Sequence, residues 1–151
     1  MNRFSLCGLV LLGVIIAVVT ITTGSGRVYA ESDVVIVANK SLPVDSLTKV
    51  ELKNIFLGNT VLWNPDLQVN LVTLKNSAAH DQFVQKYTGK TPDQFSRWWK
   101  RMLFTGQGTI PICFVSEDAA IEYLEKTSGA IGYVSSLPST DKVKIIQITN
   151  K

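Results

Sequence analysis

Few side chains in this sequence are of the types that carry out chemistry, and they do not gather into a catalytic set. The chain has one histidine, His80, and two cysteines, Cys7 and Cys113. It contains no Ser/His/Asp arrangement, no glycine-rich phosphate loop and no His/Cys spacing typical of a metal site. The sequence therefore predicts a protein that is not an enzyme and that carries no metal and no other cofactor.

The segment 75–80 is the first candidate for a binding site. It joins an apolar predicted strand to the start of a predicted helix. Strand ends in open α/β sheets commonly bind ligands, and free N–H groups at a helix start suit an anion. Lys75 would add charge, and Asn76 and Ser77 would add hydrogen-bonding groups. The alternative is that Ser77 only caps the helix and that His80 is a solvated residue of its first turn.

The loop Thr105-Gly106-Gln107-Gly108 is the second candidate. Glycine lets the backbone approach a ligand closely, although it also serves any tight connection. We expect Thr105, Gly106 and Gly108 to form the far side of the anion site.

Two adjacent tryptophans, Trp98 and Trp99, lie in a predicted helix. Neighbouring helical residues point about 100° apart, so one ring is predicted to pack in the core and the other to cover a neighbouring helix or stay partly exposed. The basic residues Arg97, Lys100 and Arg101 surround this pair. They form either a solvated helix face or a docking surface for an acidic partner or a membrane.

The first thirty residues have the layout of a secretory signal peptide. A basic start at Arg3 precedes an uncharged stretch, 4–23, and small residues lead to a cleavage site after Ala30. The apolar stretch is close to the roughly 20 residues that span a bilayer, so an uncleaved anchor facing the periplasm is the alternative. We expect residues 31–151 (151 − 30 = 121 residues) to form one periplasmic domain.

The predicted mature domain is nearly neutral. Removing Arg3 and Arg27 leaves 15 − 2 = 13 basic residues against 12 acidic ones. A nucleic-acid binder would need a basic face, so this class is excluded. Cys113 is then the only cysteine, which rules out an intramolecular disulfide. Its neighbours Ile112 and Phe114 predict a buried strand, with Cys113 in the core.

The order of predicted elements, β-α-β-α-α-β-α-β-β, predicts an α/β domain with a mixed central sheet flanked by helices. Capping-box spacing at Thr48 and Glu51 and a Thr91-Pro92 start mark two of the helices. Strands are predicted at 34–38, 68–74, 111–115, 130–134 and 143–148. Helices are predicted at 48–57, 77–87, 91–103 and 117–126.

Several of these stretches resemble phosphate-binding proteins of ABC transporters. Residues 47–58 followed by Trp63 resemble the signature L-T-x-x-E-L-x-x-I-F-x-G…W of that family. Residues 129–134 resemble its P-G-A-I-G-Y-V segment, with Ser128 in the place of proline. Residues 104–108 are similar to a loop in short, single-lobe members. The resemblance spans about residues 34–135 and implies one lobe of a type 2 periplasmic-binding-protein fold, the second of the two lobes that close on an oxyanion.

The family's phosphate loop, R-S-D-x-S-G-T, corresponds to residues 75–81. Lys75 replaces the arginine, Asn76 replaces the aspartate, Ser77 is kept and the Ser-Gly-Thr part is absent. Lysine is a point charge and lacks the two parallel bonds of arginine. The resemblance implies that phosphate or a related oxyanion is the ligand, for an ABC-type uptake system. Because of these departures from the motif, we expect weak binding or none, unless a second chain completes the cleft as a homodimer. The alternative is an interaction module that has lost its ligand and contacts a transporter, a porin or a sensor in the cell envelope.

Overall fold

The computed structural model describes residues 33–107 and 109–150. The predicted leader and Gly108 lie outside these residues. The strands are β1 (Val35–Asn39), β2 (Ser46–Thr48), β3 (Leu62–Asn64), β4 (Leu67–Gln68), β5 (Asn70–Leu74), β6 (Ile112–Phe114), β7 (Ala130–Val134), β8 (Val143–Ile145) and β9 (Gln147–Thr149). The helices are α1 (Lys49–Phe56), α2 (Ala78–Phe83), the π-helical segment η1 (Val84–Thr88), α3 (Pro92–Phe104) and α4 (Glu117–Lys126).

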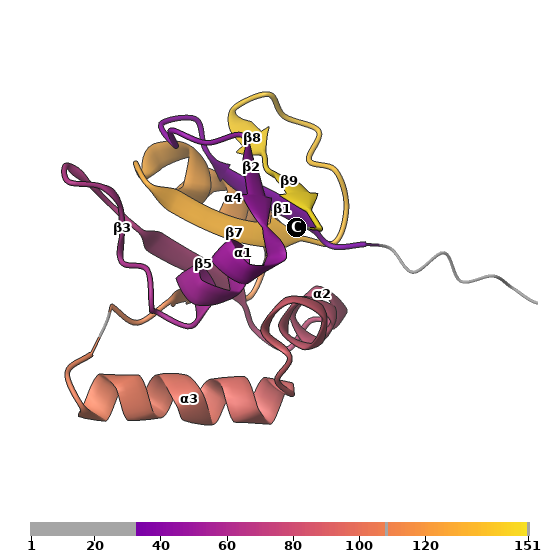
Figure 1. The fold of residues 1–151 in the computed structure, drawn as a ribbon. Coiled ribbons are helices and arrows are strands. Elements are labelled where there is room, and N and C mark those ends of the chain that lie inside the picture. Colours follow the sequence, from indigo (N-terminus) through magenta and orange to yellow (C-terminus); the bar gives the residue numbers. More distant parts are fainter. Residues whose placement is uncertain (1–32, 108, 151) are drawn as a thin grey trace, which may run out of the picture.

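A five-stranded mixed sheet forms the centre of the domain, in the order β6-β5-β7-β1-β8 (Figure 1). β5 runs parallel to both β6 and β7, whereas β1 is antiparallel to β7 and β8. Two small sheets, β2 with β9 and β3 with β4, lie at its margins. The carboxyl ends of β5 and β6 therefore meet at one edge of the sheet, where open α/β folds usually bind ligands.

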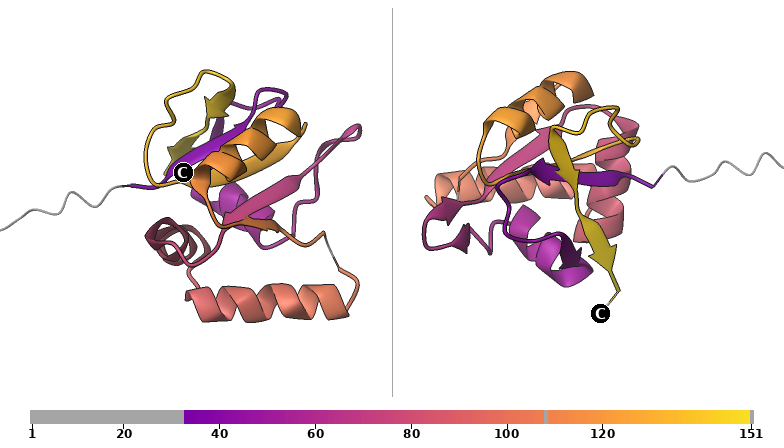
Figure 2. Two further views of the ribbon diagram at one scale, coloured as in Figure 1. Left: turned by 180° about the vertical axis from the view of Figure 1, so that it is seen from behind. Right: turned by 90° about the horizontal axis from the view of Figure 1, so that it is seen from above.

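Helices cover both faces of the sheet, which confirms the predicted α/β class. α4 packs on one face, and α1 and α2 lie on the other (Figure 2). α3 lies apart from the sheet at the periphery of the molecule (Figure 1). It is held to the end of α1 by the two tryptophans, since the Nε1 atoms of Trp98 and Trp99 donate to the carbonyls of Leu57 and Phe56 at 3.0 and 3.2 Å.

Side-chain caps begin the helices where the sequence predicts them. Thr48 forms a complete capping box with Glu51, and Thr91 forms another with Gln94. The hydroxyl of Ser116 accepts from the N–H of Ala119 at 3.1 Å. These bonds satisfy backbone donors that the first helical turn leaves unpaired. The starts of α1, α3 and α4 are therefore confirmed.

An aromatic cluster fills the core between the sheet and the layer formed by α1 and α2. Phe83, which is fully buried, stacks on Tyr133 of β7 with ring centroids 4.0 Å apart and planes 8° apart. Phe56 of α1 lies 4.5 Å from the Phe83 ring, and Tyr87 lies 5.4 Å from it. The cluster fixes the ring of Tyr133, whose hydroxyl points toward the end of β5.

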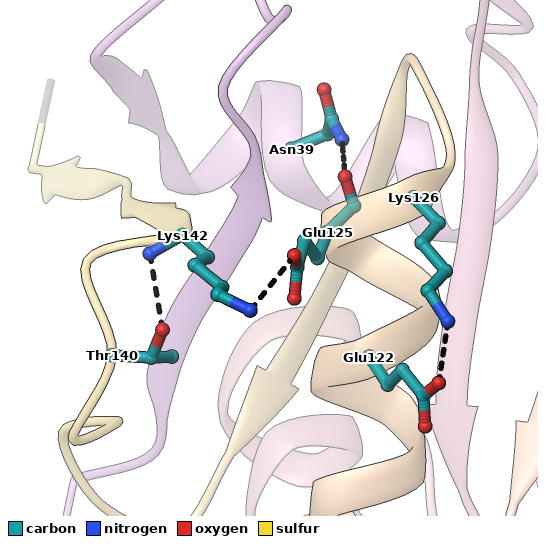
Figure 3. Close-up of polar contacts among 6 residues, drawn as sticks. All are labelled: Asn39, Glu122, Glu125, Lys126, Thr140 and Lys142. Atoms are coloured by element: carbon teal, nitrogen blue, oxygen red, sulfur yellow. Dashed lines mark hydrogen bonds and ion pairs between the residues drawn. The ribbon is translucent and has the colours of Figure 1, made fainter.

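Asn39, at the end of β1, closes the last turn of α4. Its Nδ2 donates to the carbonyls of Leu124 and Glu125 at 2.6 and 2.9 Å, and its Oδ1 accepts from the N–H of Ser41 at 2.8 Å. Figure 3 shows this amide above the helix end, beside the ion pair that joins Lys142 and Glu125 at 3.2 Å. The last helical carbonyls, which lack partners within the helix, are satisfied in this way.

Two sequence predictions are wrong in detail. Cys113 is exposed, because β6 is an edge strand and its thiol faces an open cleft rather than a covered face. The predicted last strand, 143–148, is two strands in different sheets. The chain changes sheets at Ile146, which is buried and whose N–H donates to the carbonyl of Ile36 at 2.9 Å.

Two predicted elements also differ in extent. β5 begins at Asn70, after the small β3–β4 hairpin, and the helix that begins after Ser77 continues to Thr88 through η1. Within 33–107 and 109–150, no helix has both the length and the apolar character needed to cross a bilayer.

Candidate functional site

A cleft of about 530 Å³ opens between the carboxyl ends of β5 and β6, the start of α2 and the inner face of α3. Its lining is mainly apolar, with a few polar groups that converge from the sheet edge, which is the usual make-up of a small-molecule site. The apolar lining includes Leu74, Phe95, Trp99, Leu103, Ile110 and Pro111.

Lys75 and Asn76 enter the cleft directly after β5. The N–H of Lys75 donates to the carbonyl of Phe114 at 2.8 Å, so the ends of β5 and β6 are tied together at this point. Asn76 adopts a left-handed conformation (φ 51°), which asparagine tolerates better than most residues and which turns the chain toward α2. The exposed Lys75 ammonium has no ion-pair partner among the described residues.

His80 also lines the cleft, and it is half-buried rather than a solvated residue of the first helical turn. Its Nδ1 lies 2.6 Å from the Tyr133 hydroxyl oxygen, and its ring meets Phe95 edge-on at 5.9 Å. Burial lowers the pKa of His80 below its ordinary value, against the weaker effect of the neighbouring Asp81, which raises it. The solvated-residue alternative for His80 is therefore wrong, because Tyr133 and Phe95 draw the ring inward.

The charged lining of the cleft is balanced. Lys75 and Lys100 are the cations, and Asp81 and Asp93 are the carboxylates. A balanced set gives no strong overall field, so an anion would be held by direct hydrogen bonds at the Lys75 side rather than by net charge. The apolar wall would strengthen these bonds by excluding water.

The predicted site residues converge only in part. Lys75, Asn76 and His80 line the cleft, whereas Ser77 caps α2 by accepting from the N–H of His80 at 3.1 Å. Thr105 and Gly106 follow the end of α3 and are not among the lining residues. Gly108 lies outside the described residues. The far wall is instead the inner face of α3.

Sequence reasoning missed that wall. Phe95, Trp99 and Leu103 recur at helical spacing, and this pattern marks one apolar face of α3. The pattern predicts that this face is directed toward the rest of the domain, but it does not show that a cleft separates part of the face from the sheet. Cys113 was also missed as a cleft residue, because its neighbours suggest a core strand.

A second, smaller groove of about 360 Å³ lies on the outer side of α3. Lys90, Arg97 and Arg101 line it together with Gln94 and Trp98, and no carboxylate is among its lining residues. The Lys90 ammonium lies 4.9 Å from the centroid of the Trp98 ring, a cation–π contact. Within the described part of the chain, none of the three cations forms an ion pair.

A metal is not favoured at either place. In the part of the chain that the structure describes, no group of three or more His, Cys, Asp or Glu side chains is arranged to hold one. His80 has only one ring nitrogen free of the Tyr133 contact, and Cys113 is a single thiol. The cleft is thus equipped for hydrogen bonding and charge contacts.

No protein-family profile matches the sequence, and no curated protein matches it either. Solved structures do match. A phosphate ABC transporter substrate-binding protein from Clostridium perfringens, with bound phosphate, aligns at TM-score 0.59 and 18% identity over 77% of this chain and 44% of that one. The chain has the fold of part of a substrate-binding protein.

Two further solved structures match over a similar share of this chain. An ABC-type phosphate transport receptor from Vibrio cholerae aligns at TM-score 0.56 and 18% identity, over 77% of this chain and 46% of that one. PstS from Borrelia burgdorferi aligns at TM-score 0.59 and 17% identity, over 78% of this chain and 47% of that one. This chain thus spans less than half the length of each of these proteins, and the likeness at this identity concerns the fold. It confirms the predicted single α/β lobe.

Proposed function

We propose that the protein is an exported solute-binding module that holds phosphate or a related oxyanion in the cleft at the end of β5, for an ABC-type uptake system in the periplasm. The observation that carries the proposal is the convergence of Lys75, Asn76 and His80 at the mouth of an apolar cleft. The likeness to solved phosphate-binding proteins supports the ligand class and the transporter partner.

The three side chains offer the donors that an oxyanion accepts. The Lys75 ammonium supplies charge, and the Asn76 amide and a ring N–H of His80 supply neutral hydrogen bonds. The cleft is open to solvent, and no second lobe covers it among the described residues, so much of the desolvation that gives high affinity is missing. Weak binding by one chain follows, and a second copy placed over the cleft as a homodimer would strengthen it.

Replacing Lys75 with glutamate is expected to weaken oxyanion binding by about tenfold to hundredfold, since a charged hydrogen bond contributes roughly 1.5–3 kcal/mol and the variant adds repulsion. Lys75 is exposed, and among the described residues its side chain forms no hydrogen bond and no ion pair, so the fold should be unaffected. Calorimetric titration of residues 31–151 with phosphate, and with sulfate for comparison, measures the change.

The matched control is Lys40→Glu, which makes the same charge change at an exposed position after β1. Because β1 is antiparallel to β7, and β7 is parallel to β5, Lys40 lies at the opposite end of the sheet. If the Lys75 and Lys40 variants bind phosphate with equal affinity, Lys75 is not part of the binding site. No heat from the native domain up to millimolar phosphate would overturn the proposed ligand.

The outer groove of α3 favours a second function, an interaction module of the cell envelope. Three unpaired cations beside a half-buried tryptophan fit an acidic segment of a partner protein, such as a transporter, a porin or a sensor. Phe104, which is 87% exposed, lies on the same face one helical turn beyond Arg101 and would add an apolar contact.

The double variant Arg97→Glu/Arg101→Glu is expected to abolish capture of a partner from envelope extract by the immobilised domain, because both contacts become repulsive. Lys40→Glu should retain capture, and raising the salt from about 0.1 to 1 M should reduce it for the native domain. Capture that survives both the double variant and high salt would exclude this groove. Trp99→Ala is a poorer probe, because Trp99 is buried and its loss would disturb packing.

A further inference from the structure

The Tyr133 hydroxyl sits between two nitrogen atoms in the core. Its oxygen lies 3.2 Å from the backbone nitrogen of Leu74, which donates to it, and 2.6 Å from Nδ1 of His80. Tyr133 itself is 1% exposed, and its ring is clamped by the stacked ring of Phe83. The hydroxyl therefore has no access to water and must satisfy its hydrogen bonds within this group.

The positions of the Leu74 nitrogen, the Tyr133 oxygen and His80 Nδ1 determine which of these atoms carry protons. The Leu74 N–H can only donate, so the Tyr133 oxygen is the acceptor of that bond. The hydroxyl proton then needs an acceptor of its own, and His80 Nδ1 is the other group within hydrogen-bonding distance. Nδ1 must therefore carry no proton, and a neutral His80 carries its single proton on Nε2.

Nε2 is the ring nitrogen of His80 that the Tyr133 contact leaves available to the cleft. The two ring nitrogens of histidine point in divergent directions, so Nε2 points away from Tyr133, and His80 is among the cleft-lining residues. Among the described residues, no buried side-chain nitrogen or oxygen lacks a hydrogen-bond partner, and no bond is made by Nε2. Nε2 is therefore accessible to solvent or to a ligand.

We propose that Tyr133 is a positioning residue that locks His80 as the neutral Nε2–H tautomer, so that His80 presents one fixed hydrogen-bond donor to acceptor atoms of the anion in the cleft. The role of the donor rests on the proposed function, whereas the locked tautomer does not. This arrangement selects ligands rich in acceptor oxygens and disfavours ammonium groups, which have no lone pair to offer Nε2–H.

The lock also sets the response to pH. A proton added to Nδ1 would face the hydroxyl proton of Tyr133 and break the chain of bonds, so the neutral form is favoured. The charged side chains that line the cleft with His80 are Asp81 on the same helix, Lys75 at the end of β5, and Asp93 and Lys100 on α3, and the Cys113 thiol lines it from β6. Burial outweighs Asp81 and lowers the pKa of His80. Sulfate, which does not titrate near neutral pH, should therefore bind equally well from about pH 8 to pH 7, where His80 stays mostly neutral.

The single histidine makes a direct test available. In ¹⁵N NMR spectra of residues 31–151, the native domain should show the Nε2–H tautomer and a His80 pKa below 6.5. Tyr133→Phe should give a mixture of tautomers and a higher pKa. Tyr87→Phe, which removes the hydroxyl of another tyrosine in the same aromatic cluster, should leave both unchanged. If the native domain shows the Nδ1–H tautomer, or if Tyr133→Phe and the native protein give equal spectra, Tyr133 does not fix the tautomer of His80 and the proposal is wrong.

Two substitutions of His80 test the role of Nε2 as a donor in the cleft. The amide nitrogen of glutamine reaches the position of Nε2, whereas asparagine reaches only that of Nδ1. By calorimetry with phosphate and sulfate, His80→Gln should bind within about threefold of native, and His80→Asn should lose about tenfold. Equal losses overturn the donor role. If the native domain binds neither anion, the proposed function and the donor role both fail, and the NMR spectra alone decide the tautomer.

Discussion

Replacing Gly129 with alanine is expected to destabilise the domain by about 3 kcal/mol or more, which is a large part of the stability of a small domain. Gly129 has φ +74°, a conformation that costs other residues about 1 kcal/mol. A Cβ atom here would also lie 2.1 Å from the backbone carbonyl oxygen of Gln68 and 3.2 Å from Cδ1 of Leu67. Because the nearer atom belongs to the backbone, a side-chain rotation cannot relieve the clash.

The clash would spread through the bonds that Gly129 makes. Its carbonyl accepts from Nε1 of Trp63 at 2.9 Å and from the N–H of Asn70 at 3.1 Å, and its own N–H donates to the Ser41 hydroxyl at 3.1 Å. A shift of this residue therefore disturbs the entry to β5, the β3–β4 hairpin and the turn after β1 together. Urea unfolding followed by tryptophan fluorescence measures the loss.

Gly89→Ala is the matched control for Gly129→Ala. Gly89 has nearly the same backbone angle, φ +68°, but an added Cβ meets no atom within 4 Å. The free energy of unfolding of Gly89→Ala should therefore fall only by the cost of the left-handed backbone conformation, about 1 kcal/mol. Similar losses for the two variants would show that the Gln68 carbonyl moves away without cost, and the argument from close approach would fail.

Local signals made most of the fold predictable. Each correctly predicted helix start has a cap whose partner lies three residues away, as in the Thr48–Glu51 and Thr91–Gln94 boxes. The central strands β1 and β7 are continuous apolar segments, which is typical of strands covered on both faces. Such information is contained in a few consecutive residues, so it can be recognised without knowledge of the rest of the chain.

The errors come from contacts between distant segments. β2 and β9 are three residues each and pair with one another about 100 positions apart, so neither shows a period of its own. Cys113 has apolar neighbours that suggest burial, but the place of β6 at the edge of the sheet decides its exposure. Whether a strand lies at the edge or in the centre of a sheet depends on the strand order, and the local sequence pattern contains no information about that order.

The candidate site was also predictable only where its residues are close together in the sequence. Lys75, Asn76 and His80 were predicted from one strand–helix junction, and they do share the cleft. The partner of His80 is Tyr133, 53 residues further along the chain, and the opposite wall is formed by α3. Thr105 and Gly106 were expected opposite Lys75, but they follow the carboxyl end of α3 and do not line the cleft. α3 has 13 residues and a length of roughly 20 Å, so its inner face, and not the loop after it, forms the wall opposite Lys75.

The second large effect is expected for Phe83→Ala, which should destabilise the domain by about 3–5 kcal/mol. Phe83 is fully buried, and its ring packs against Phe56, Tyr87 and Tyr133. Truncation leaves a cavity that these rings cannot fill without leaving their rotamers, so transfer and cavity costs add. Urea unfolding measures the change, and Phe83→Leu, which keeps most of the volume, should lose clearly less.

Phe83→Ala should also act at a distance on the cleft, because the Phe83 ring holds the plane of Tyr133 and thereby the hydroxyl that faces His80. We expect the ¹⁵N spectrum of His80 in the folded variant to shift toward a mixture of tautomers. Leu124→Ala is the control: it empties an equally buried position on α4, across the sheet from the aromatic cluster, and should be destabilised by about 2–5 kcal/mol with an unchanged His80 spectrum. If both cavities alter His80 alike, the effect is general loosening; if neither does, Tyr133 keeps its place without the stacked ring.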